Sequence, residues 1–208
     1  MNSFQENSLL SILGKLTDSL ILNLIFLISC IPVITIGASC TAFYYTTHKV
    51  LRHDRSYVLR EYIRAWKGDF KQATICWLVF LVLGGILGAD CYVMFLLFQA
   101  GHSYGSVYVF FGILLTVVIL WMVYAFAYLA RFQNRIKEIL KNSGAMMFIH
   151  FPKTLILLLI LGAAAFAIWS IPLLVFLVPV LAVWFIEVLL ESVFVKYMRE
   201  EDRKAEME

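Results

Sequence analysis

Residues 107–130 read VYVFFGILLTVVILWMVYAFAYLA, a run of 24 residues without a charged side chain. Helix rises by 1.5 Å per residue, so about 20 apolar residues are enough to cross the hydrocarbon core of a bilayer. The run therefore predicts a transmembrane α-helix, and the question becomes whether the rest of the chain follows the same pattern.

The composition of the whole chain agrees with that prediction. Of its 208 residues, 62% are hydrophobic and 15% are charged, whereas globular domains are about 45–50% apolar and about 25% charged. The charges are also bunched between long apolar runs. The sequence thus predicts an all-α fold, a single polytopic transmembrane domain over residues 1–208. We expect five spans, at about 20–36, 73–98, 107–130, 154–170 and 173–195.

Two basic connectors separate these spans. The connector over residues 49–72 carries seven Lys or Arg, the connector over 131–153 carries five, and a charged tail occupies 196–208. Lys and Arg accumulate in cytoplasmic loops, so both connectors and the C-terminus are expected to be cytoplasmic. Five crossings then place the N-terminus on the outside of the membrane.

The first apolar segment allows a second topology. Pro32 and Gly37 interrupt it, and an unbroken helix from Asp18 to Val50 would be about 50 Å long, well beyond the hydrocarbon core. We expect a break at this point. The chain then either crosses, which is the topology we favour, or dips in and returns so that the N-terminus stays inside.

Both connectors have the periodicity of amphipathic helices, the first ending at Gly68 and the second at Pro152. One interpretation is an interfacial helix that meets anionic lipid headgroups. The other is a docking surface for a cytoplasmic protein. The candidate contact residues are the same in both: Arg60, Arg64, Trp66, Lys67, Phe70, Lys71, Arg131 and Arg135.

Three carboxylates fall within the apolar spans and form a candidate intramembrane polar site: Asp90, Glu187 and Glu191. A carboxylate at membrane depth is costly and marks a site or a polar helix contact. Glu187 and Glu191 share one helix face, and Glu187 is the deepest of the three. It is expected either to line a functional cavity or to contact another helix, with Arg131 as the candidate partner.

Enzyme chemistry is not indicated. The chain contains no Walker-type loop, no Gly-x-Ser-x-Gly and no His-Glu-x-x-His. Its four cysteines and four histidines are not spaced along the sequence as metal ligands are. We therefore expect no catalytic residue, no cofactor, no metal and no nucleic-acid partner.

Three blocks carry a resemblance to a known family: NLIFLISCIPVITIGA at 23–38, WKGDFKQAT at 66–74 and FPKT at 151–154. They resemble the YesL-like family of small bacterial integral membrane proteins. The resemblance implies a gene often found beside carbohydrate ABC importers, and it implies no reaction and no binding residue.

Three hypotheses about function follow. The leading one is an accessory subunit that contacts the permease or ATPase subunits of a carbohydrate ABC importer through the basic connectors. The alternative is a small stand-alone transporter or channel, with Glu187 and Asp90 lining a path. The third is a membrane regulatory partner of a sensor system.

Overall fold

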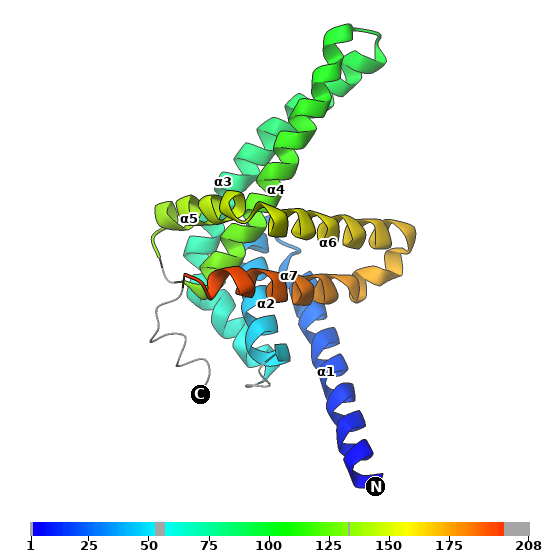
Figure 1. Ribbon diagram of the computed structural model, residues 1–208, viewed down its shortest axis with the longest axis vertical. Coiled ribbons are helices and arrows are strands. Elements are labelled where there is room, and N and C mark those ends of the chain that lie inside the picture. The colour runs from blue at the N-terminus through cyan, green and yellow to red at the C-terminus, as the bar shows by residue number, and fades with distance from the viewer. Residues whose placement is uncertain (1, 53–56, 133, 198–208) are drawn as a thin grey trace.

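A computed structural model describes the backbone of residues 2–52, 57–132 and 134–197, with side chains throughout these ranges except at 2–13, 51 and 52. Every element in the described ranges is helical (Figure 1), which confirms the all-α prediction. The long helices are α1 Asn2–Ser29, α2 Ile36–Thr46, α3 Val58–Gln99, α4 Tyr108–Arg131, α5 Ile136–Ile149, α6 Phe151–Ser170 and α7 Val178–Phe194. The short elements are η1 Val33–Thr35, the π-helical η2 Thr47–Arg52, η3 Ser103–Val107 and η4 Pro172–Phe176.

Helix α3 merges the first basic connector with the second span. It has 42 residues and is therefore about 63 Å long, roughly twice the thickness of the hydrocarbon core. The prediction that a connector helix ends at Gly68 is wrong, since α3 runs through this residue. A glycine costs a helix interior only about 1 kcal/mol, and the packing of α3 against α2 and α4 outweighs that cost.

Helices α3 and α4 form a long antiparallel hairpin that projects from the rest of the molecule (Figure 1). Phe80 packs edge-on against Trp121, with ring centroids 5.3 Å apart. Farther along the hairpin, the Cys91 thiol lies 3.5 Å from the carbonyl oxygen of Tyr108. Gly101 has φ +86° in the turn at the tip, a conformation that glycine adopts without steric cost.

Helices α6 and α7, joined by η4, form a second hairpin, which lies at a wide angle to the first (Figure 1). Among the described residues, three helical stretches are long and apolar enough to cross a membrane, at Val58–Gln99, Ser103–Arg131 and Phe151–Ser170. The chain therefore has the features of a membrane protein. The count of five spans stays a prediction.

The second connector contains a separate helix, α5, which ends at Ile149 just before the Pro152 expected to terminate it. The Glu138 side chain accepts a hydrogen bond from the Arg135 backbone N–H at the start of this helix, at 3.3 Å. Trp121 of α4 donates from its indole nitrogen to the Leu140 carbonyl oxygen at 3.1 Å. Helix α5 is thereby held against the base of the long hairpin.

The chain reverses direction at the break around Pro32. The Ser29 carbonyl oxygen accepts hydrogen bonds from the hydroxyls of Thr35 at 2.6 Å and Ser39 at 3.1 Å. The rings of Phe26 and Phe43 stack with centroids 4.3 Å apart. Helix α2 therefore returns alongside α1, which is the path expected from the second topology, in which the segment dips in and comes back.

Gly37 lies where α2 crosses α3 most closely. A Cβ at this position would lie 2.5 Å from the Ala73 carbonyl oxygen and 2.6 Å from the Trp77 Cβ. Gly37→Ala should force the two helices apart and destabilise the protein by about 1–3 kcal/mol, the usual cost of overpacking. The measurement is thermal unfolding in detergent.

Gly84→Ala is the matched control, because the added Cβ would have only Leu115 Cδ1 nearby, at 3.9 Å. This variant should keep or slightly raise the unfolding temperature, since alanine is the better helix former. Equal unfolding temperatures for the two variants would show that α2 and α3 do not approach as described.

Candidate functional site

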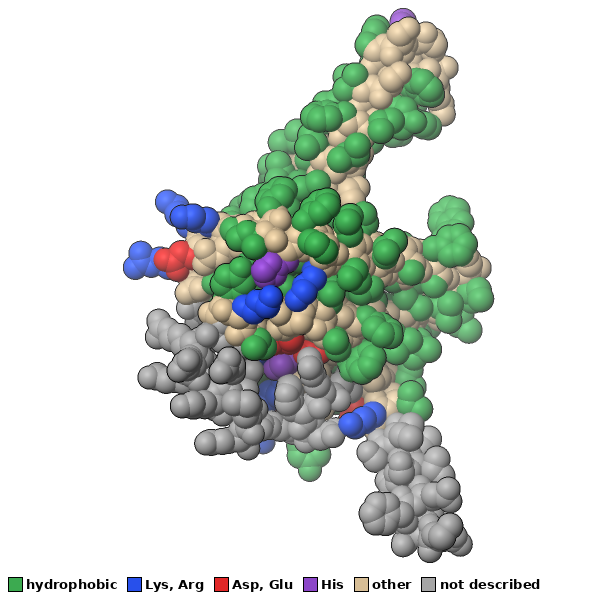
Figure 2. All heavy atoms as spheres, viewed as in Figure 1, with side chains coloured by type: hydrophobic (Ala, Val, Ile, Leu, Met, Phe, Trp, Pro, Cys, Tyr) green, Lys and Arg blue, Asp and Glu red, His purple; other side chains and the backbone are tan. Residues whose placement is uncertain are grey.

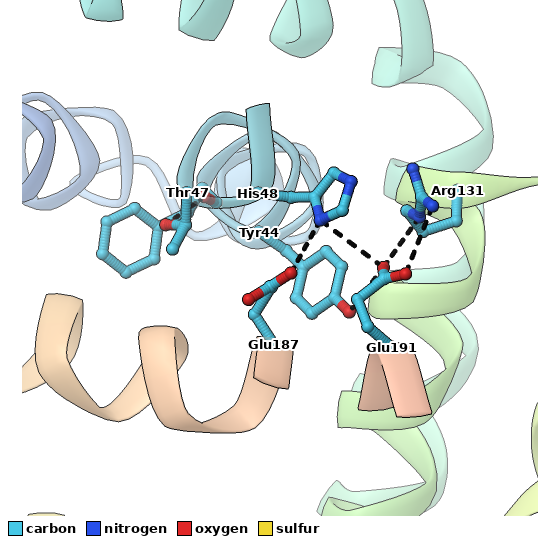
Figure 3. Close-up of polar contacts among 7 residues, drawn as sticks. Tyr44, Thr47, His48, Arg131, Glu187 and Glu191 are labelled. Atoms are coloured by element: carbon cyan, nitrogen blue, oxygen red, sulfur yellow. Dashed lines mark hydrogen bonds and ion pairs between the residues drawn. The ribbon is translucent and has the colours of Figure 1, made fainter. Parts of the chain in front are cut away.

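A cluster of buried charged and polar side chains joins three parts of the chain. Tyr44 comes from α2 and His48 from η2, Arg131 ends α4, and Glu187 and Glu191 lie on α7 (Figure 3). Glu187 is 0% exposed, Glu191 4% and His48 8%. Charges at such depth must be paired, because each would otherwise lose its hydration without compensation. We call these five residues the buried charge cluster.

Glu187 is held by His48. The Nδ1 atom of His48 lies 2.6 Å from Oε1 of Glu187, within hydrogen-bonding distance, and Nδ1 is the donor when the carboxylate is ionised. The same nitrogen is 3.7 Å from Oε1 of Glu191. One imidazole therefore faces both carboxylates of α7, which are one helical turn apart, as the sequence spacing predicted.

Glu191 is held by Arg131. The guanidinium approaches with Nε 2.7 Å from Oε1 and with Nη2 donating to Oε2 at 3.2 Å. The Tyr44 hydroxyl donates to Oε1 at 3.4 Å. The sequence suggested Arg131 as the partner of Glu187, whereas the structure pairs it with Glu191, because the last turn of α7 meets the last residue of α4.

His48, Glu187 and Glu191 also have the side chains of a potential metal site, since their ligand atoms all lie within 4.8 Å of one another. An imidazole with two carboxylates suits first-row divalent cations. However, Oε1 of Glu191 is already 2.7 Å from the Arg131 Nε, so a cation bound there would face a guanidinium. The geometry favours an ion-paired network over a cation site.

His48 and Tyr44 are the two residues of this cluster that the sequence interpretation missed. The histidines have no acidic residue at ligand spacing in the sequence, and Glu187, which His48 contacts, lies 139 positions further along the chain. A local signal was present: Thr41, Tyr44 and His48 are spaced by three and four and share one helix face. The face is polar and buried, which indicates a polar contact with another helix.

Asp90 is not part of the cluster. It precedes Cys91, which contacts Tyr108 at the first residue of α4, whereas Arg131 is the last residue of that helix. The two ends of α4 are about 34 Å apart at 1.5 Å per residue. Asp90 therefore lies toward the tip of the long hairpin, whereas the buried charge cluster lies at its base.

The first four turns of α3 carry a second candidate site. Four basic side chains on one face of these turns are exposed: Arg60, Arg64, Lys67 and Lys71. We call them the cationic stripe. Two exposed apolar side chains lie beside it, Leu59 at 53% exposure and Ile63 at 40%.

Four of the eight predicted contact residues do not belong to this surface. Trp66 and Phe70 are half-buried and pack against the core, with ring centroids 4.9 Å apart. Arg131 is directed into the buried charge cluster (Figure 3). Arg135 is exposed at the start of α5. The amphipathic periodicity predicted for this helix is correct. However, α2 and α4 pack against the part of α3 that carries Trp66 and Phe70, so these two side chains are not available on the surface.

A polar cavity of about 400 Å³ is lined by Arg64 of the stripe and Arg131 of the cluster, and by Lys49 of η2. The Lys49 ammonium donates to Glu61 at 2.7 Å. This hydrogen bond holds the pKa of Lys49 above its ordinary value, so the ammonium stays charged. Figure 2 shows apolar side chains over both projecting hairpins, and most of the visible charged groups where the hairpins meet.

The fold and these sites define an all-α, membrane-like protein with an internal ion-paired network and a cationic stripe. The family model described as "Protein of unknown function, DUF624" matches residues 20–91, roughly a third of the chain. This is the YesL-like family, so the resemblance is confirmed over these residues. No curated protein and no solved structure matches the chain. The matched part contains His48 and the cationic stripe, whereas Arg131, Glu187 and Glu191 lie beyond it.

Proposed function

We propose that this protein is a non-enzymatic accessory subunit in the bacterial cell membrane that docks a cytoplasmic partner through the cationic stripe. The partner is an acidic surface on the permease or ATPase of a carbohydrate ABC importer. The observation that carries the docking proposal is the exposed basic face on a helix that also enters the membrane. The choice of partner rests on the resemblance to the YesL-like family.

The position of the stripe on α3 supports docking rather than simple lipid binding. Because α3 is about twice as long as the hydrocarbon core is thick, a large part of it must lie outside the hydrocarbon. The stripe occupies the turns before the apolar run that begins at Ala73. The positive-inside bias places these turns in the cytoplasm.

The side chains of this surface also suit a protein partner. Leu59 and Ile63 are exposed next to Arg60 and Arg64, so apolar contacts are bordered by charges, as at protein–protein interfaces. Complementary charges accelerate association and select against wrong partners. An acidic surface is therefore the expected complement, while Lys71, nearest to the apolar run, is placed to meet anionic headgroups.

The buried charge cluster supports a structural role beneath this surface. It links η2 and α7 to the end of α4, and α4 packs along α3. A transport path lined by Glu187 and Asp90 would need a route about as long as α4, roughly 34 Å. Glu187 and Glu191 already have His48 and Arg131 as partners, which favours a structural role for the two carboxylates over a transport path.

A triple variant tests the docking surface. Arg60→Gln, Arg64→Gln and Lys67→Gln together should reduce the importer subunits that copurify in mild detergent by more than about tenfold, which corresponds to 1.4 kcal/mol. The measurement is affinity purification from native membranes followed by quantitative mass spectrometry.

The matched control removes three exposed cationic side chains just before and within α5, namely those of Arg135, Lys137 and Lys141. It lowers the cytoplasmic positive charge by the same amount and should leave copurification unchanged. Equal losses in both triple variants, or a wild-type chain that recovers no importer subunit, would contradict the proposal.

A further inference from the structure

The outward face of α1 is a continuous row of large aliphatic side chains. Its members are spaced by four residues: Leu16 at 52% exposure, Leu20 at 45%, Leu24 at 48% and Ile28 at 66%. The opposite face packs inward, with Leu22 fully buried and Asn23 donating to the Val175 carbonyl oxygen at 3.0 Å. An exposed apolar row of this length indicates contact with lipid or with another protein.

The same apolar surface continues over the turn between α1 and α2. Ile31 is 77% exposed, Val33 57% and Ile34 60%. Soluble proteins form such turns from polar residues, whereas this tip presents only aliphatic side chains outward.

Several backbone groups of the turn are hydrogen-bonded internally, as hydrocarbon favours for any non-helical segment. Ile31 N–H donates to the Ile28 carbonyl at 3.2 Å, and Thr35 N–H donates to the Pro32 carbonyl at 3.0 Å. The Ser29 carbonyl accepts from the Thr35 and Ser39 hydroxyls. Pro32 has no N–H to satisfy.

The apolar row of α1 is shorter than the hydrocarbon core of a bilayer, although α1 as a whole has 28 residues. From Leu16 to Ser29 the helix covers about 20 Å, whereas the hydrocarbon core is about 30 Å thick. Gly37, which follows the tip, packs against Ala73 and Trp77. These α3 residues begin the apolar run that enters the membrane, so the tip lies level with the start of that run.

We infer that α1 and α2 form a hairpin on the cytoplasmic side whose apolar tip meets the inner leaflet, so that the N-terminus stays in the cytoplasm. Lipid of the inner leaflet is the partner of the exposed tip residues Ile31, Val33 and Ile34. Helix interfaces within membranes are rich in small residues that let backbones approach, and the outward row contains only Leu, Ile and Val. The inference does not depend on the docking partner.

Cysteine accessibility tests this topology. In a chain whose four native cysteines are replaced, Lys15→Cys should react with a membrane-impermeant maleimide in inside-out vesicles only, as should Lys67→Cys. Ser103→Cys, at the tip of the α3–α4 hairpin, should react in right-side-out vesicles only. Ile31→Cys should react in neither orientation until detergent is added.

Two results would overturn the inference. Labelling of the Lys15→Cys or Ile31→Cys variant from the outside would mean that the first segment crosses the bilayer. Labelling of the Ile31→Cys variant from the cytoplasm would place the tip in water or against a partner. If replacing the native cysteines prevents folding, an azide-bearing amino acid at position 31 of the native chain and an impermeant alkyne give the same readout.

Discussion

Replacing Arg131 with alanine is expected to lower the free energy of unfolding by about 3–5 kcal/mol, the usual cost of removing one partner from a buried ion pair. The guanidinium contacts both carboxylate oxygens of Glu191, at 2.7 Å and 3.2 Å. Glu191 is only 4% exposed, so water cannot replace the lost partner. The measurement is the unfolding midpoint in detergent.

Two further variants make this expectation specific. Arg135→Ala removes an exposed arginine four positions later in the sequence and should change the free energy of unfolding by less than about 1 kcal/mol. The double replacement Arg131→Met with Glu191→Met removes both charges and should recover much of the stability, since apolar side chains often substitute for buried pairs without loss. A double variant as unstable as Arg131→Ala alone would contradict the pairing.

The second large effect is expected at His48. Its replacement by alanine removes the 2.6 Å hydrogen bond to Glu187 and should cost about 1.5–3 kcal/mol, as hydrogen bonds to charged groups do. A double-mutant cycle with Glu187→Gln should give a coupling energy above about 0.5 kcal/mol. His102→Ala, at an exposed residue of the hairpin tip, is the control and should be neutral.

The same Glu187→Gln variant separates a scaffold from a transporter. In proteoliposomes that contain only this chain, the scaffold interpretation expects no substrate flux from either the wild type or the variant. Flux that depends on Glu187 would favour the transport hypothesis and would assign the cluster a different role.

The sequence alone predicted those helices and breaks that depend only on residues close together in the chain. The uncharged run at 107–130 became α4, and the break near Pro32 separates α1 from α2. The four-residue spacing of Glu187 and Glu191 placed them on one face of α7. In each case the periodicity of a helix, or the geometry of proline, decides the outcome without reference to other parts of the chain.

Features that depend on distant parts of the chain were not predictable in this way. Periodicity assigns Trp66 and Phe70 to one face of a helix but does not say that α2 and α4 cover that face. His48 meets Glu187 across 139 positions, so no spacing rule could pair them. Gly68 reads as a helix end, but α3 continues through it, since a glycine costs a helix interior only about 1 kcal/mol.

The most direct test of the docking proposal is photo-crosslinking from position 63. A benzoyl-phenylalanine in place of Ile63, which is 40% exposed beside the cationic stripe, should crosslink to an importer subunit in native membranes. The same group in place of Ile113, 58% exposed on the apolar surface of α4, should react with lipid alone. Crosslinks from position 63 to lipid only, with no protein adduct, would contradict the proposal that this surface binds a cytoplasmic partner.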